Sequence, residues 1–286
     1  MDGGAEAMPP NWLKPVRIAA AVVDKLKLAS HTRPFTDGTA GQLRASMARA
    51  GVDRTVVLPV GTNPLKIASV NDASLRANEA GSDLIFFAAI HPDAPNWRED
   101  LDRCAAAGMK GVKLHPVYQG VDLDDPRCLR ILDRAGELGL TVVSHAGDDI
   151  GYPGVVRCAP EMIARALRQV GPVSFVAAHM GGWRCWERVA DVLGPSGAFI
   201  DTAFSLGRLT PLEPDYYSEA ELSLLGAEEF CALVRAFGSR RVLFGSDSPW
   251  ADQAADVAQI RALPLTDAEK ADILGGNAGR LLGLER

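Results

Sequence analysis

The sequence predicts an α/β protein in which parallel strands alternate with helices around a barrel. Seven short apolar runs, each bounded by Gly or Pro, have the composition of strands that are buried on both faces. Helix-like segments separate these runs, so that a strand–helix unit recurs about every 30 residues. Six of the runs end in His or Asp. A (β/α)8 barrel gathers all its strand ends at one mouth, whereas an open sheet uses a single switch point, so these polar ends favour the barrel.

The elements follow in chain order. Strands are predicted over residues 54–61, 83–92, 110–116, 140–147, 173–182, 197–205 and 241–250. Helices are predicted over residues 40–50, 67–80, 97–107, 126–138, 160–169, 185–193 and 219–237. Thr266 and Glu269 form a capping box that opens a last helical region, which continues through residues 277–284. No linker or low-complexity stretch interrupts this order, so we expect one domain over residues 1–286.

An eight-stranded barrel needs one strand more than these runs provide. Residues 12–30 have the pattern of a helix, so the first strand of the barrel is predicted to be missing or atypical. Either a strand lies upstream of this sequence, or this form lacks it, or residues 16–23 (VRIAAAVV) serve as a substitute. A gap in the sheet would leave unpaired edges, which favour association between copies of the chain.

Composition limits the classes of partner. The net charge is −6 and no basic patch stands out, so neither nucleic acid nor an anionic membrane is expected as a partner. No apolar stretch reaches the roughly 18 residues of a membrane span, and the N-terminus lacks the features of a signal peptide. The five scattered cysteines include no C-x-x-C pair, and we expect buried thiols in a reducing cytoplasm.

Four of the five histidines stand at predicted strand ends: His91, His115, His145 and His179. Histidine and carboxylate are the ligands of a metal such as zinc, and catalytic zinc sites commonly use three protein ligands and leave one position to water. The strand ends that carry Asp201 and Asp247 would supply carboxylates at the same mouth. His91 precedes Pro-Asp and is expected to cap a turn, while His31, in a loop, is expected to be exposed to solvent.

Residues around these histidines are candidates for substrate contact. Lys113 shares a strand face with His115, because side chains alternate along a strand. This lysine could pair with a carboxylate of a neighbouring strand, bind substrate, or carry a carbamate between two metals. Tyr118 and Gln119 follow His115 directly and could either touch substrate or pack within the loop. Asp148 and Asp149 are loop carboxylates near the mouth, with no spacing rule behind them. Residues 206–218 form a long loop with prolines, which we expect to act as a lid or specificity element.

Five motifs in order resemble the amidohydrolase superfamily, in its amidohydrolase-related branch of metal-dependent TIM-barrel hydrolases. These motifs are KGVKLHP, SHAGDDIGYP, AAHMGG, LFGSDSPW and GGNAGRLLG, and the resemblance extends over about residues 35–284. It implies a divalent metal, zinc in the first instance and manganese as the alternative. The resemblance also implies that His145 binds metal, and that His179 is either a ligand of a second metal or a general acid/base near the metal-bound water. Asp247 would contact the metal and take a proton from the attacking water.

The family's first strand normally carries a His-x-His pair, and the sequence contains none. The first hypothesis is nevertheless a metal-dependent hydrolase, in which a metal-activated water attacks a small amide, lactone or ester. His179 and His115 would hold the substrate or stabilise developing charge, and Trp250 joins the substrate-binding candidates. The second hypothesis is a decarboxylase or hydratase of small carboxylic acids, with Arg157, Arg184 and Arg208 as candidate carboxylate-binding residues. The third is a metal-poor barrel without catalysis.

Overall fold

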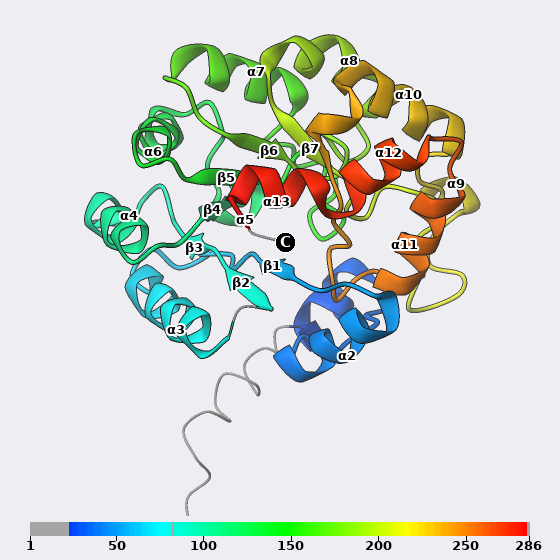
Figure 1. Ribbon diagram of the computed structural model, residues 1–286, viewed down its shortest axis with the longest axis horizontal. Helices are drawn as coiled ribbons and strands as arrows, with labels where there is room; N and C mark the ends of the chain where they lie inside the picture. The colour runs from blue at the N-terminus through cyan, green and yellow to red at the C-terminus, as the bar shows by residue number, and fades with distance from the viewer. Residues whose placement is uncertain (1–22, 82, 285–286) are drawn as a thin grey trace, which may run out of the picture.

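The computed structural model describes residues 23–81 and 83–284, and its strands form the wall of a barrel (Figure 1). Every one of the seven predicted runs contains strand, which confirms the α/β prediction. The strands are β1 (Thr55–Val57), β2 (Leu84–Phe86), β3 (Ala88–Ala89), β4 (Gly111–Leu114), β5 (Thr141–Ser144), β6 (Phe175–Ala177), β7 (Phe199–Asp201) and β8 (Val242–Leu243).

All strand pairs are parallel, as expected for βαβ units. β1 pairs with β2, and β3 to β8 form one sheet in sequence order. The second predicted run, residues 83–92, supplies both β2 and β3, which join different neighbours on either side of Phe87. The backbone N–H of Phe87 still donates to the carbonyl oxygen of Val57 at 3.0 Å, so the two sheets remain connected there.

Helices surround the strands. They are α2 (Ala40–Ala50), α3 (Ile67–Ala80), α4 (Trp97–Ala106), α5 (Pro116–Gln119), α6 (Pro126–Glu137), α7 (Pro160–Gln169), α8 (Trp186–Leu193), α9 (Glu219–Leu222), α10 (Ala227–Phe237), α11 (Gln253–Ala262), α12 (Asp267–Ala271) and α13 (Asn277–Leu282). The prediction of one helix over residues 219–237 was wrong, because α9 ends before Gly226, whose N–H donates to Glu229 and starts α10 anew. Two helices, α5 and α11, were not predicted.

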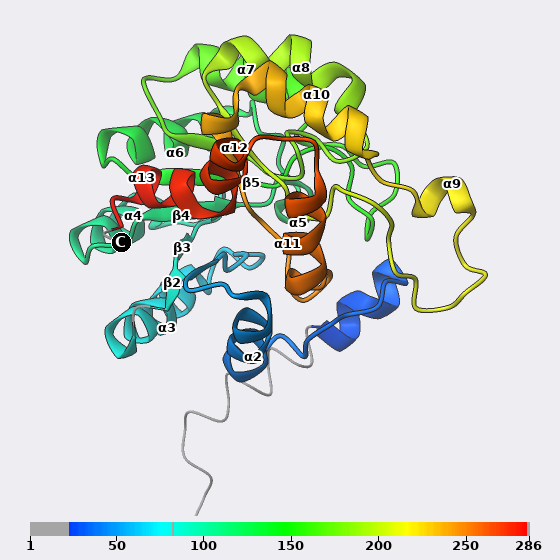
Figure 2. The same cartoon turned by 45° about the vertical axis from the view of Figure 1, so that its right-hand side comes forward.

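The helices form a closed ring between the last and the first strand, β8 and β1, where the strands themselves do not pair. Helix α11, which follows β8, packs against α2, which precedes β1 (Figures 1 and 2). Within residues 23–81 and 83–284, however, no strand joins β8 to β1, so the described barrel is open at this position. Residues 23–30 are helical, in agreement with the helix predicted over residues 12–30, whose remainder lies outside the described residues together with most of the candidate strand 16–23.

The interior of the barrel is closed at the end opposite the histidines. Asn277 at the start of α13 donates to the carbonyl oxygen of Val242, the first residue of β8, so α13 lies at the N-terminal end of the strands. Leu282 of this helix packs with Phe87, Val143 and Val176 in one buried cluster. All five cysteines are buried free thiols, as predicted. Among residues 23–81 and 83–284, no helix is both long enough and apolar enough to cross a bilayer.

Candidate metal centre

His115 lies at the C-terminal end of β4, where a buried amide fixes the backbone. The N–H of His115 donates to Oε1 of Gln119 at 3.1 Å, and the Nε2 group of Gln119 donates to the carbonyl oxygens of Gly61 and Ile90. The side chain of Gln119 therefore ties together the segments that follow β1, β3 and β4. The ring of Tyr118 stacks on the imidazole of His115, with the two ring centroids 3.8 Å apart.

His145 follows β5 and begins a turn that is locked to a distant loop. Gly147 has a φ of +87° and lies so close to Trp183 that an added Cβ would stand 2.3 Å from backbone atoms of that residue. Only glycine permits this approach, in which the N–H of Asp148 donates to the carbonyl oxygen of Trp183 at 2.9 Å. The carbonyl oxygen of Asp148 in turn lies 3.0 Å from Nε2 of His145. The SHAGDD sequence thus folds back on its own histidine.

The same turn delivers the carboxylate of Asp149 to the two imidazoles. The N–H of Gly151 donates to Oδ1 of Asp149 at 2.8 Å, which leaves Oδ2 facing the histidines. Oδ2 lies 3.6 Å from Nε2 of His115 and 3.9 Å from Nε2 of His145. One ligand atom from each of these three buried residues lies within 4.8 Å of the other two.

The donor set fits a divalent metal. Ligand bonds of 2.0–2.2 Å in a tetrahedral site place neighbouring ligand atoms about 3.4 Å apart, close to the His115–Asp149 separation of 3.6 Å. When the Nε2–H group of His145 donates a hydrogen bond to the Asp148 carbonyl, the lone pair is left on Nδ1, so Nδ1 rather than Nε2 is the ligand atom that this histidine offers, an arrangement typical of metal-binding histidines. Nδ1 of His115 is buried with no hydrogen-bond partner among the described residues, so no described group fixes the tautomer of this imidazole, and Nε2, which faces Asp149, is free to be the ligand atom.

Electrostatics keep the imidazoles in the ligand form. Burial lowers the pKa of both His115 and His145 well below the usual range, and nearby Lys113 and His179 lower it further. Both rings are therefore neutral at pH 7 and carry a free lone pair. Burial also raises the pKa of Asp149 to about 6, although the hydrogen bond from Gly151 opposes this change.

His179 borders this group without being a member of it. Its ring meets the ring of His145 edge-on, with the centroids 5.0 Å apart, and Nδ1 lies 3.0 Å from the carbonyl oxygen of Ala203. The residue has a φ of +60°, a backbone conformation that few non-glycine residues adopt. The backbone there is held by Asp201 at the end of β7, whose Oδ1 accepts from the N–H of His179 at 2.9 Å.

Asp247 is also outside the three-residue group. It is exposed, it follows β8, and its charge raises the pKa of Asp149 and of Tyr118, so it lies near the cluster. Lys113 is buried on β4, and burial lowers its pKa while Asp201 and Asp247 oppose that shift. No salt bridge links Lys113 to any carboxylate of residues 23–81 or 83–284, contrary to the simplest of the three interpretations of this residue.

Asp149 is the residue that sequence reasoning did not select. The doubled aspartate after SHAG was visible, but its position depends on the contact with Trp183, which lies far along the chain. His91 caps a turn as predicted, since the N–H of Asp93 donates to its Nδ1 at 3.0 Å. His31, predicted to be exposed, is partly exposed: its side chain keeps 29% of its accessible surface, stacks on the exposed ring of Tyr216 at a centroid distance of 3.6 Å, and lies 3.1 Å from Glu213.

The three candidate carboxylate-binding arginines all have partners. Arg157 pairs with Asp122 at 2.8 Å, and Arg208 pairs with Glu219 at 3.0 Å. Arg184 donates to the carbonyl oxygen of Glu221 and lies over the ring of Trp183. Each guanidinium therefore already uses some of its N–H donors, and a substrate carboxylate would have to share it with an existing partner.

Comparisons with known proteins identify the fold and the family. The solved structures that resemble the chain include an uncharacterized TIM-barrel protein from Bordetella bronchiseptica, with 20% identity, a TM-score of 0.71 and coverage of 94% of this chain and 92% of that one. A 5-carboxyvanillate decarboxylase from Sphingomonas paucimobilis has 18% identity, a TM-score of 0.65 and coverage of 93% and 96%. A putative 2-pyrone-4,6-dicarboxylic acid hydrolase from Pseudomonas putida has 22% identity, a TM-score of 0.62 and coverage of 92% and 94%.

These similarities show the TIM-barrel fold. No curated protein matches the chain. The family model described as Amidohydrolase matches residues 29–284, which is nearly the whole sequence. The chain therefore belongs to the amidohydrolase family, in its amidohydrolase-related branch of TIM-barrel proteins.

Proposed function

We propose that this protein is a metal-dependent hydrolase that acts on a small amide, lactone or ester. The observation that carries the proposal is the buried group of His115, His145 and Asp149. Two neutral imidazoles and a carboxylate form a ligand set that zinc accepts at catalytic sites, with manganese as the alternative ion. When bound, such an ion lowers the pKa of a water molecule to about 7 and polarises a carbonyl oxygen.

Asp247 is the proposed proton acceptor. A general base must reach the proton that it removes, and this carboxylate follows β8 at the same mouth as the histidines. Because Asp247 is exposed, it can exchange the proton with solvent after each turnover. His179 is proposed as the second acid–base group. Donation from its Nδ1–H to Ala203 leaves the lone pair on Nε2, where it can accept a proton or a substrate hydrogen bond.

Lys113, Tyr118 and Trp250 are proposed to contact substrate. The lysine and the tyrosine flank His115 on β4 and α5, while Trp250 follows Asp247. For Gln119 we propose a positioning role, because its side-chain amide already bonds three backbone groups. Kinetics and metal content test these roles. Substitution of a residue that contacts substrate should change KM, whereas substitution of Gln119 should in addition lower the metal content.

Measurement of metal content in variants distinguishes residues that bind the metal from residues that only lie beside it. The purified 286-residue chain is assayed by elemental analysis beside five single variants: His115→Ala, His145→Ala, Asp149→Asn, His179→Ala and Asp247→Asn. We expect about one zinc or manganese ion per chain, lost in the first three variants and kept in the last two. If His179→Ala and Asp247→Asn lose the ion instead, the ligands are His145, His179 and Asp247. If neither the wild type nor any variant holds metal, the hydrolase proposal is wrong and the metal-poor barrel remains.

A decarboxylase of small carboxylic acids is the second candidate. Two observations favour it: the resemblance to a 5-carboxyvanillate decarboxylase and the buried cationic side chain of Lys113. The pairing of Arg157, Arg184 and Arg208 weighs against it. Assays of ester and lactone hydrolysis, run beside carbon dioxide release from aromatic and dicarboxylic acids, decide between the two reactions.

A further inference from the structure

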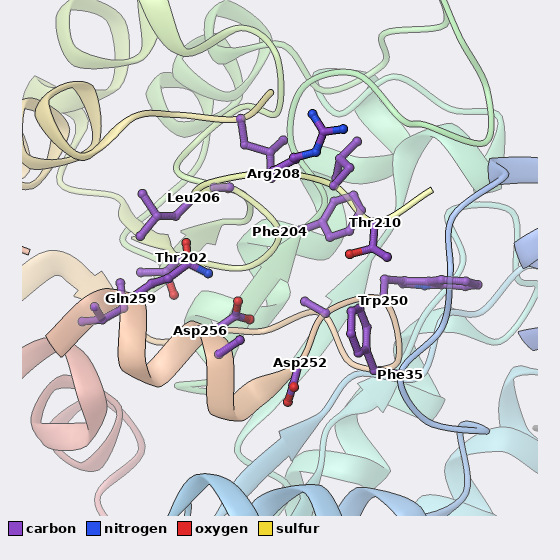
Figure 3. A pocket seen from close by; sticks show the side chains of 16 residues that line it. Phe35, Thr202, Phe204, Leu206, Arg208, Thr210, Trp250, Asp252, Asp256 and Gln259 are labelled. Carbon is purple, nitrogen blue, oxygen red and sulfur yellow. The ribbon is translucent and has the colours of Figure 1, made fainter. Parts of the chain in front are cut away.

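A cavity opens beside the C-terminal ends of β7 and β8, apart from the three-residue metal group (Figure 3). Its volume is about 160 Å³, close to the roughly 150 Å³ of an engineered cavity that takes up benzene. The walls come from the segment before α2, the loop after β7 and the start of α11. The cavity can thus receive one ring-sized group.

Aromatic side chains form much of this wall. Figure 3 shows Trp250 and Phe35 together on one side of the cavity, with Phe204 nearby on the loop after β7. Leu206 and Ile260 add apolar surface. Aromatic faces carry a negative potential and therefore attract cations as well as rings.

One carboxylate projects into this space from α11. Figure 3 shows the Asp256 side chain directed toward the loop that carries Thr202 and Phe204. Its Oδ2 atom is buried and has no hydrogen-bond partner among the described residues. Burial raises the pKa of Asp256 to about 7, and the charges of Asp252 and Asp247 add to this effect. A buried carboxyl oxygen without a partner is costly, which points to a donor that is not part of the described chain.

The charged side chains that line the cavity do not supply a hydrogen-bond donor to Asp256. Asp252 also lines it, with one oxygen accepting from the N–H of Ala254 at 3.1 Å. The cationic lining residue, Arg208, is held by Glu219. The cavity thus combines the carboxyl group of Asp256 with aromatic side chains and a second carboxylate, an environment complementary to an organic cation with N–H donors.

We propose that this cavity holds a ring-sized, ammonium-bearing end of the substrate, whose N–H groups donate to Asp256. The assignment to substrate rests on the proposed function, whereas the binding of the cation does not. Asp247 connects the two sites, because it stands between β8 and the Trp250–Asp256 segment and its charge acts on both Asp149 and Asp256. The reacting carbonyl would then lie on the histidine side of Asp247.

The test compares a cation with a neutral ligand of the same shape. Dissociation constants of benzylammonium and benzyl alcohol are measured at pH 8 by calorimetry and by saturation-transfer NMR on the full chain. We expect benzylammonium to bind at least about tenfold more tightly, as a charged hydrogen bond allows. Asp256→Asn should abolish this preference, and Asp215→Asn, which removes the same charge from an exposed loop position outside the cavity, should preserve it.

Two further variants keep the result interpretable. Phe35→Leu trims a partly exposed cavity wall and should weaken both ligands alike. His145→Ala should keep the preference for the cation even though metal is lost. Equal affinities in the wild type, or a preference that survives Asp256→Asn, would overturn the proposal. Loss of cation binding in His145→Ala would do the same, because the ligand would then sit at the histidines. If the wild-type protein holds no metal, that result would contradict the proposed hydrolase function and leave the proposed cation site unaffected.

Discussion

The imidazole rings of His115 and His145 lie face to face, with centroids 4.4 Å apart and an angle of 9° between their planes. Two stacked imidazolium cations would repel each other, and burial would make each of them still less stable. The pair is therefore neutral over the physiological range, and protons should compete with a metal mainly at Asp149.

This arrangement predicts how metal affinity depends on pH. The pKa of Asp149 is raised to about 6, while those of His115 and His145 lie well below 6.5. Affinity for zinc should be nearly constant above about pH 7 and should fall progressively below it, approaching a tenfold loss per pH unit near pH 5, because a single proton is displaced. Competition with a chromophoric chelator between pH 5 and 8 measures this slope. A slope of two or three protons near pH 6 would mean that the histidines titrate normally.

Gln119→Ala should destabilise the barrel. The variant removes one acceptor and two donated bonds at the ends of three strands, and it leaves buried carbonyl oxygens of Gly61 and Ile90 without this donor. A loss of about 2–4 kcal/mol in the free energy of unfolding is expected. Urea denaturation measures it. Gln169→Ala is the control, since this exposed side chain bonds only within its own helix end and should cost well under 1 kcal/mol.

Comparison of Gly147→Ala with Gly154→Ala should separate the cost of backbone strain from the cost of a steric clash with Trp183. Gly154 also has a positive φ, of +77°, but an added Cβ there meets nothing within 4 Å, whereas at Gly147 it would lie 2.3 Å from Trp183. Gly154→Ala should therefore cost only about 1–2 kcal/mol. Gly147→Ala should cost roughly 1–3 kcal/mol more and should also lower metal affinity, because the same turn carries Asp149. Equal costs and equal metal affinity in the two variants would show that the contact with Trp183 does not hold the turn.

The strands could be predicted because each is a short apolar run closed by Gly or Pro, and the helix α3 could be bounded by its periodic pattern. Helix α11 was missed because its alanine-rich sequence, QAADVAQIRA, spreads apolar residues around the helix rather than along one stripe. In the candidate site, strand-end positions marked His115 and His145. Asp149 could not be selected, because its placement depends on a glycine that allows close contact with Trp183, and no local spacing encodes that contact.

Asp256→Asn should change the pH dependence of stability. The folded-state pKa of Asp256 is about 7, above the ordinary value of 3.8, because of burial and the charges of Asp252 and Asp247. The folded state then holds this proton more tightly than the unfolded state, so the contribution of Asp256 to stability is greatest at low pH. It should fall as the pH rises from about 4 to about 7, by at most about 1.4 kcal/mol per unit.

The amide of Asn cannot ionise, so the variant should be more stable than the wild type at pH 8, and this advantage should shrink or reverse at pH 5. Urea denaturation at the two pH values, without added cation, measures the difference. Asp215→Asn is the control for net charge and should shift stability equally at both pH values, since this side chain is exposed. A wild type and an Asp256→Asn variant that respond alike to pH would mean that Asp256 titrates as an ordinary solvated carboxylate. The cavity would then lack the buried charge that makes it selective for a cation.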